Sequence, residues 1–275
     1  MARFAVVVTA PRVEVLTQVN HGKRGSCHGA VMNVTEAQPV TGTAPARVGR
    51  PPMPREHGAW GILLIPFATA VGVSGVWNAK LALLLGSVVS FYLARASWRK
   101  RDDRWLVFWL AGSALGAGVL IGVWQLWWLA LVGAAAAPLA FRRTERSLAG
   151  QLAAVAGLTM TAPAAWYVAT GQLEYRLWAL NALYFGGGVL YVKMHLATAI
   201  AREATGRWPV LWYHGALVAV AVAAWPVGLA LLPAVARAVV GVLRLQPRLR
   251  IKRLGWTEVG HSVVFGLLVI GLSRI

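Results

Sequence analysis

Side chains that could do chemistry are few in this sequence, and they stand at helical spacing within apolar stretches. Arg95, Arg99 and Asp102 are separated by four and then three residues, which places them on one face of a helix. Because guanidinium groups bind phosphate oxygens in pairs, this face and the adjacent Asp103 form a candidate phosphate or diphosphate site. The alternative interpretation is that the arginines anchor the helix end and extend toward the lipid head groups.

A second group of basic side chains occurs later in the chain. His195 and Arg202 are seven residues apart and share a helix face, and Lys193 stands beside them. Lys193 lies about as deep in its apolar run as Arg95 lies in its own. Charged and polar groups within an apolar helix cost free energy, so Lys193 and His195 are functional candidates. A lysine near the interface could also extend its ammonium group to the membrane surface.

Glu56 and His57 stand at the start of the first apolar run. A histidine there could carry a proton or hold an anion, so this pair is expected to line a cavity. The alternative interpretation is an interfacial start of a membrane span, where neither group costs much free energy.

Other polar groups are expected to be structural. Glu258 and His261 are expected to pair with Lys252 or Arg253, and Gly186–Gly188 is expected to allow close helix packing. The sequence has one cysteine and shows no Gly-rich nucleotide motif, nucleophile elbow or HExxH motif. No metal site or cofactor is therefore predicted from these residues.

The composition indicates what must position these groups. Of 275 residues, 58% are hydrophobic and 13% are charged, whereas a typical soluble domain has about 25% charged residues. The net charge of +18 could indicate nucleic-acid binding, but the basic residues are confined to short breaks between apolar runs. The sequence therefore predicts a polytopic membrane protein whose partner is the lipid bilayer and not nucleic acid.

The apolar runs predict an all-α bundle of about nine transmembrane helices. A bilayer core of about 30 Å needs about 20 helical residues, so two of the runs are too long for one crossing. They are expected to break near Gly122–Gln125 and at Trp225-Pro226, where proline cannot continue the helix. The expected spans are Gly58–Ala79, Leu81–Trp98, Trp105–Phe141 (two), Ala149–Leu173, Leu177–Ile200, Val210–Leu243 (two) and Trp256–Ser273.

Basic residues divide unequally between alternate loops of this arrangement. From Met53 onward, sixteen Lys and Arg residues fall on one side, and only Lys80, Arg176 and Arg274 fall on the other. Because cytoplasmic loops carry the excess of Lys and Arg, the basic side is predicted to be cytoplasmic. The N-terminus is then inside and the C-terminus outside.

Residues 1–52 differ in composition from the remainder of the chain. They hold scattered charges, small polar residues and several prolines. This segment is expected to be disordered, or not translated at all if the protein starts at Met32 or Met53 and not at Met1. Residues 53–275 are expected to form the nine-span transmembrane domain.

Three motifs resemble those of the YwiC-like bacterial membrane proteins. They are Pro54–Trp60 with the following Ile65–Phe67, Leu190–Lys193 with Arg202-Glu203, and Ile251–Gly255 leading to Glu258. The resemblance covers residues 53–275. It implies a multi-pass protein of the bacterial cytoplasmic (inner) membrane, in a family without an established activity.

A more distant resemblance is to the UbiA-type intramembrane prenyltransferases, through Pro138–Arg143 and Ala162–Gly171. It implies a UbiA-like fold of nine helices, in which Asp-rich motifs after the second and sixth helices hold magnesium and a prenyl diphosphate. This sequence departs there, since only Asp102 and Asp103 follow the second span and Glu203 follows the sixth. Two magnesium ions need several oxygen ligands. Magnesium is therefore expected only if a reduced metal site operates.

Three functions remain open, and with them the question of enzymatic activity. The first is binding or transport of an anionic isoprenoid or phospholipid-type lipid at a cytoplasmic-side pocket. The second is prenyl transfer with a reduced metal site of Asp102, Asp103 and Glu203. The third is a transporter or an accessory membrane subunit. The candidate ligand-binding residues are Glu56, His57, Arg95, Arg99, Asp102, Asp103, Lys193, His195 and Arg202.

Overall fold

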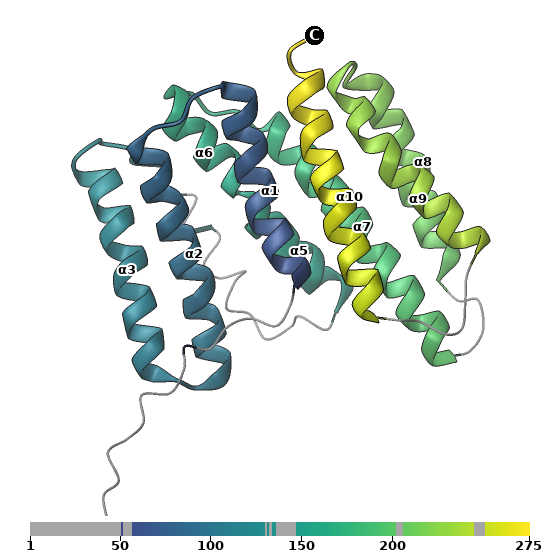
Figure 1. Cartoon of the computed structure of the whole chain (residues 1–275), viewed down its shortest axis with the longest axis horizontal. Coiled ribbons are helices and arrows are strands. Elements are labelled where there is room, and N and C mark those ends of the chain that lie inside the picture. Colours follow the sequence, from purple (N-terminus) through teal and green to yellow (C-terminus); the bar gives the residue numbers. More distant parts are fainter. Residues whose placement is uncertain are drawn as a thin grey trace, which may run out of the picture. The chain divides into compact units, whose positions relative to one another are not determined.

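A computed structural model describes residues 51, 57–129, 131, 134–135, 147–201, 206–244 and 251–275, which all belong to one compact unit. The expectation for residues 1–52 falls, apart from Pro51, outside the described residues. The described chain is helical, and no strand occurs in these ranges. Its helices are α1 (His57–Ser74), α2 (Ala79–Lys100), α3 (Asp103–Gly122), α5 (Leu148–Thr159), α6 (Thr161–Thr170), α7 (Arg176–Ala201), α8 (Arg207–Ala223), the 3-10 helix η1 (Val227–Leu231), α9 (Leu232–Leu243) and α10 (Ile251–Leu272) (Figure 1).

The all-α class is confirmed over these residues, and four helical stretches are long and apolar enough to cross a membrane. They are α2, α3, the pair α5–α6 and the Leu254–Leu272 part of α10. Shorter apolar helices span Gly58–Ser74 and Val227–Leu243. These lengths agree with a membrane protein, while the count of nine spans and the UbiA-like arrangement stay predictions.

The first helix is shorter than the sequence predicted. It ends at Ser74 and not at Ala79, because Gly75 adopts a left-handed φ of 67° that stops the helix. Asn78 then caps α2 by accepting a hydrogen bond of 3.0 Å from the Leu81 N–H. The cap residue therefore sets where the second helix begins.

The predicted span Ala149–Leu173 is divided between Thr159 and Thr161 into α5 and α6. Pro163 lies in the first turn of α6, where its missing N–H has no helical partner to lose. The hydroxyl of Thr161 donates a 3.0 Å hydrogen bond to the Leu63 carbonyl of α1. This contact fixes the division between α5 and α6 against α1.

Helix α7 lies against α1, α5 and α8, while α1 also packs on α6 and α10 (Figure 1). In the core, the rings of Tyr184 (α7) and Phe265 (α10) stack with centroids 4.0 Å apart. The buried Asn181 of α7 donates a 3.2 Å hydrogen bond to the Thr69 hydroxyl of α1. These contacts hold α1, α7 and α10 together, and the same three helices wall the cavity described below.

Close packing of α7 uses glycine on both sides of the contact. A Cβ added at Gly187 would lie 3.0 Å from Nε2 of His214 on α8, so the predicted packing role of Gly186–Gly188 agrees with this contact. On α9, Gly241 lies directly against the ring of Tyr191. Larger side chains at these positions would push α8 and α9 away from α7.

Candidate functional site

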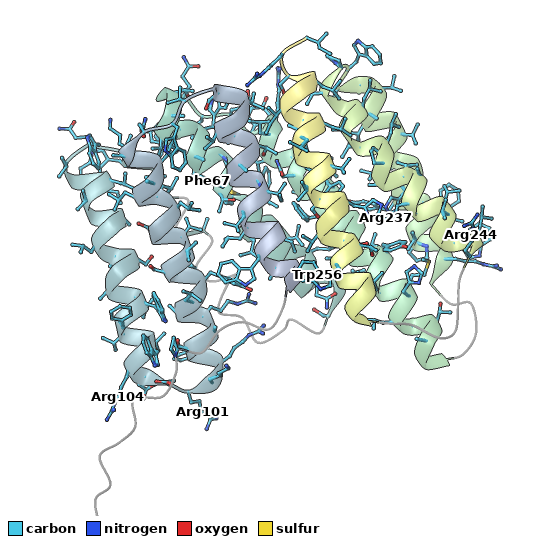
Figure 2. The ribbon with its side chains drawn as sticks, in the orientation of Figure 1. Phe67, Arg101, Arg104, Arg237, Arg244 and Trp256 are labelled. Atoms are coloured by element: carbon cyan, nitrogen blue, oxygen red, sulfur yellow. The ribbon has the colours of Figure 1, made fainter. Side chains whose placement is uncertain are left out.

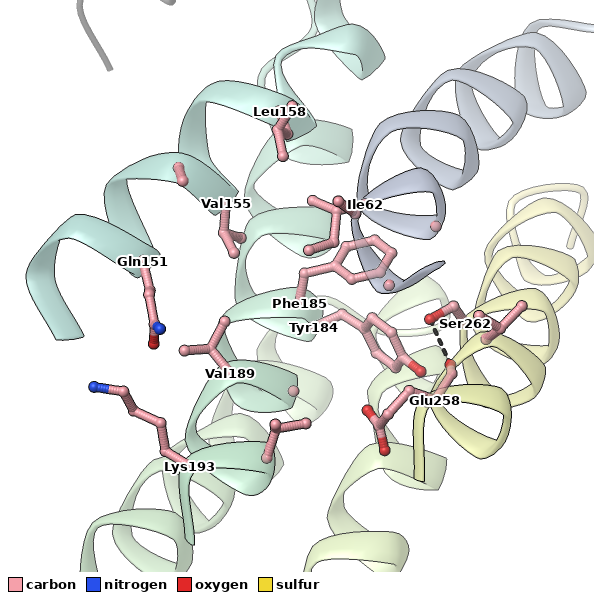
Figure 3. A pocket seen from close by; sticks show the side chains of 18 of the residues that line it. Ile62, Gln151, Val155, Leu158, Tyr184, Phe185, Val189, Lys193, Glu258 and Ser262 are labelled. Atoms are coloured by element: carbon pink, nitrogen blue, oxygen red, sulfur yellow. Dashed lines mark hydrogen bonds between the residues drawn. The ribbon is translucent and has the colours of Figure 1, made fainter. Parts of the chain in front are cut away.

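A cavity of about 480 Å³, called here the head-group cavity, lies between α1, α2, α5, α7 and α10 (Figure 3). Its volume falls in the range of about 300–1,000 Å³ that is typical of small-molecule sites. Its basic lining residues are Arg95 and Arg99 from α2 and Lys193 from α7. Cationic groups that the sequence placed in two separate spans therefore line one cavity.

The two arginines follow the one-face spacing expected from the sequence. Arg95 is buried, with 8% of its surface exposed, and Arg99 is exposed one helical turn later. Helix α2 stops directly afterwards, because Arg101 adopts a left-handed φ of 55° and its N–H bonds the Ser97 and Trp98 carbonyls. The cavity thus meets α2 at the end of the helix.

Asp102 and Asp103 stabilise the N-terminal end of α3. The Asp102 side chain accepts a hydrogen bond of 3.4 Å from the Trp105 N–H, which is the arrangement of an N-cap. Asp103 is exposed in the first turn, where a carboxylate is stabilised by the helix dipole. Neither residue is among the described residues that line the head-group cavity.

Lys193 and His195 face different sides of α7, although they stand close together in the sequence. Two residues along a helix correspond to a rotation of about 200°. Lys193 lines the head-group cavity, whereas His195 is 9% exposed and packs edge-on against Tyr191 with ring centroids 4.5 Å apart. Tyr191 in turn contacts Gly241 of α9. His195 therefore belongs to the α7–α9 contact.

The remaining candidates fall partly outside the described residues. Glu56, Arg202 and the side chain of His57 are among the parts that the structure does not describe. The residues that follow His57, Gly58 and Ala59, line the head-group cavity. The start of α1, where the first motif lies, is therefore part of the cavity wall.

A buried ion pair between Arg237 of α9 and Glu258 of α10 was missed in the sequence. Nη1 of Arg237 donates to Oε2 of Glu258 at 2.6 Å, and their side chains are 6% and 16% exposed. The guanidinium also lies 4.7 Å from the centre of the Tyr191 ring, within cation–π range. Figure 2 shows Arg237 well inside α9, away from Arg244 at the helix end.

Glu258 brings this ion pair to the head-group cavity, because Glu258 is one of its lining residues. The side chains of Lys252 and Arg253, the expected partners, lie outside the described residues, and the described partner is Arg237. The available signal was Arg237 itself, since an arginine inside an apolar run indicates an acidic partner on another helix.

A second cavity of about 180 Å³, called here the apolar cavity, adjoins the first. It is lined mainly by hydrocarbon side chains of α2, α3, α5 and α6, among them Leu84 and Leu120. Arg95, Ala154 and Leu158 line both cavities. The two cavities therefore meet at Arg95, with the cations on one side and the apolar wall on the other.

Metal-ligating side chains do not gather in the described part of the chain. Within those ranges there is no group of three or more His, Cys, Asp or Glu residues close enough to hold a metal ion. Glu203, the third acid of the reduced metal site considered above, is not among the described residues.

Comparison with known proteins agrees with the first of the three motifs. The model of the YwiC-like protein family matches residues 53–166, which contain Arg95 and Arg99. The Uncharacterized protein YwiC of Bacillus subtilis (strain 168) is 28% identical over 178 residues, or 59% of this chain and 72% of that relative. No solved structure matches the chain. The resemblance carried by Pro54–Trp60 is therefore confirmed as a similarity to YwiC-like proteins over residues 53–166.

Proposed function

We propose that this protein binds an amphipathic anionic lipid of the isoprenoid phosphate or phospholipid type. The head group occupies the head-group cavity, and the start of the hydrocarbon chain occupies the apolar cavity. The observation that carries the proposal is that Arg95, Arg99 and Lys193 line one cavity although they come from two helices.

The described residues that line the cavity include more cations than acids, which favours an anion. Three of these residues are cationic, and the one acidic residue among them, Glu258, pairs with Arg237. Arginine and lysine side chains that line a cavity in an apolar helical bundle attract phosphate oxygens. Arginine can hold such a phosphate through two parallel N–H···O bonds.

The apolar cavity supports an amphipathic ligand, although it does not supply the selectivity. A lipid tail in the bilayer is already in an apolar environment, so it gains little by moving against an apolar cavity wall. Discrimination between lipids must therefore come from the head group and the cations around it. We therefore expect the protein to select lipids by the charge of the head group and not by the length of the hydrocarbon chain.

The cavity is proposed to open toward the cytoplasmic side. Figure 2 shows Arg101 and Arg104 together at the end of α2 and the start of α3, and Arg99 lies next to this turn in the chain. Clusters of basic residues in short loops favour the cytoplasmic side of a membrane.

The test compares charged and uncharged lipids on the purified full chain in detergent. The probes are a polyprenyl monophosphate, phosphatidylglycerol and the uncharged polyprenol, and bound lipid is measured by native mass spectrometry. Both anionic lipids are expected to bind more tightly than the polyprenol. Arg99→Ala or Lys193→Ala should each weaken anionic-lipid binding about ten-fold, which corresponds to losing one charge-assisted hydrogen bond.

The matched control is Arg104→Ala. Arg104 is exposed at the start of α3 and is not a lining residue, so the variant removes the same charge without altering the cavity. It should bind both anionic lipids as the parent chain does. Equal binding of charged and uncharged lipids, or an equal loss in the control, would contradict the proposal.

A further inference from the structure

One side of the head-group cavity offers hydrogen-bonding groups, with no cation there among the described lining residues. Tyr184 comes from α7, and Glu258 and Ser262 come from α10. Figure 3 shows these three side chains together, with Lys193 and Gln151 pointing toward each other on another side of the cavity. We call Glu258 and Ser262 the acceptor wall, and Tyr184 lies beside them. The cavity therefore has a cationic side and an acceptor wall.

Glu258 is fixed on this wall through one oxygen only. Its Oε2 accepts the 2.6 Å hydrogen bond from Arg237, while its Oε1 is buried and has no partner among the described residues. The Arg237 guanidinium is itself held over the Tyr191 ring. A carboxylate anchored in this way keeps its second oxygen ready to accept one more hydrogen bond, and a buried acceptor without a partner is unfavourable.

Ser262 adds a second acceptor on the same wall. Its hydroxyl donates to the backbone carbonyl of Glu258 at 2.8 Å (Figure 3). Since that bond uses the only hydrogen of the hydroxyl, Ser262 can offer a ligand only lone pairs. Both α10 side chains on the wall therefore favour a group that donates hydrogen bonds.

We infer that the head group bound here carries a hydrogen-bond donor on the group esterified to its phosphate, and that Glu258 accepts from that donor. The phosphate lies with Arg95, Arg99 and Lys193, and the donor-bearing end reaches the acceptor wall. This inference rests on the proposed function and specifies it further. It makes Glu258 a residue that determines which anionic lipid is preferred.

The test uses two lipids that differ in donors and not in charge. Phosphatidylglycerol and phosphatidylmethanol each carry one negative phosphodiester, but only the glycerol head group has hydroxyls. Affinities for both, with matched acyl chains, are measured on the purified full chain in detergent. The parent chain should prefer phosphatidylglycerol about ten-fold, the contribution expected of one hydrogen bond to a carboxylate.

The variant that assigns this preference to Glu258 is Arg237→Met/Glu258→Met. Removing both members of a buried ion pair avoids leaving one charge without its partner, so the double variant is chosen over either single change. Its ratio of the two affinities should fall to about one, since no carboxylate is left on the wall. The control Arg104→Ala should keep the parent ratio.

The possible outcomes separate this inference from the proposed function. A ratio near one in the parent chain, with anionic lipids still preferred over an uncharged lipid, overturns the donor inference alone. A preference that persists in the double variant overturns the role of Glu258. Binding of both phospholipids no tighter than an uncharged lipid overturns the proposed function itself. If the double variant does not fold, the parent ratio still decides the donor inference.

Discussion

Arg237 and Glu258 show how two groups that are costly in an apolar bundle are made acceptable. Each is nearly buried, and their 2.6 Å contact joins α9 to α10 while Tyr191 covers the guanidinium. A buried pair of this kind contributes little net stability compared with apolar residues, yet removing one partner is severe because the other charge is left without compensation. Replacing one member of the pair should therefore lower the stability strongly, whereas replacing both should change it little or raise it.

Single and double substitution of this ion pair are therefore expected to change stability by different amounts. Glu258→Met should lower the free energy of unfolding by about 3–5 kcal/mol, because Arg237 stays buried without its partner. Arg237→Met/Glu258→Met should be close to the parent chain or more stable. Thermal unfolding in detergent measures both variants. A double variant that is as unstable as the single one would show that the pair is not the reason for the loss.

The sequence predicted which side chains lie together where their spacing along one helix was sufficient. Arg95 and Arg99 are one turn apart and do share a cavity. His195 was grouped with Lys193 by proximity in the chain, although two residues along a helix point in different directions. The contact between Glu258 and Arg237 could not be predicted from local spacing, because Arg237 lies on another helix.

Among the elements, α8 and η1 depend on a very close approach. A Cβ added at Gly228 of η1 would meet the backbone of Ala221 on α8, which has no side-chain freedom with which to yield. This contact lies next to Trp225-Pro226, where the sequence predicted a break. Glycine at this position is therefore required by packing between two consecutive helices.

The element-scale prediction compares two glycines. Gly228→Ala should lower the free energy of unfolding by about 1–3 kcal/mol through overpacking. Gly86→Ala, on an exposed part of α2 with no atom near the added Cβ, should leave it unchanged or raise it by up to about 1 kcal/mol, since alanine favours helix. Thermal unfolding of both variants in detergent is the measurement. Equal destabilisation would mean that glycine is needed for another reason.

Helix ends were harder to predict than the helices. The hydrophobic runs predicted the positions of α2, α3, α7 and α10. In an apolar environment the backbone N–H and C=O groups must bond to each other, and a helix achieves this within one segment. The early end of α1 depends on the left-handed conformation of Gly75, and the division at Met160 depends on a contact of Thr161 with α1. A left-handed backbone conformation or a contact with another helix cannot be predicted from the hydropathy of the sequence.

At the scale of the whole molecule, the distribution of basic residues predicts which face is cytoplasmic. Arg99, Lys100, Arg101 and Arg104 lie in or beside the α2–α3 turn, whereas the basic residue beside the connection from α6 to α7 is Arg176, the first residue of α7. The positive-inside rule then predicts that the α2–α3 turn lies inside and the α6–α7 connection outside. The head-group cavity, which includes Arg99 at the end of α2, would open to the inside.

This topology predicts the labelling of introduced cysteines. In a Cys27→Ser background, Asp103→Cys at the start of α3 and Gln172→Cys in the α6–α7 connection each place one thiol at an exposed position. Asp103 is suitable because acidic residues contribute little to the positive-inside rule. An impermeant thiol reagent should label Gln172→Cys in intact spheroplasts and Asp103→Cys only in inverted vesicles. The reverse pattern, or labelling of both from one side, would contradict the assigned orientation.

Arg95, Arg99 and Lys193 are proposed to hold an anionic head group together, between α2 and α7. The decisive experiment is a cryo-electron microscopy structure of the purified full chain with added polyprenyl monophosphate. Density for a phosphate is expected within hydrogen-bond distance of these three side chains, with the lipid chain leading past Arg95 into the apolar cavity. A cavity that stays free of lipid, with the three side chains turned toward the membrane surface, would contradict this proposal.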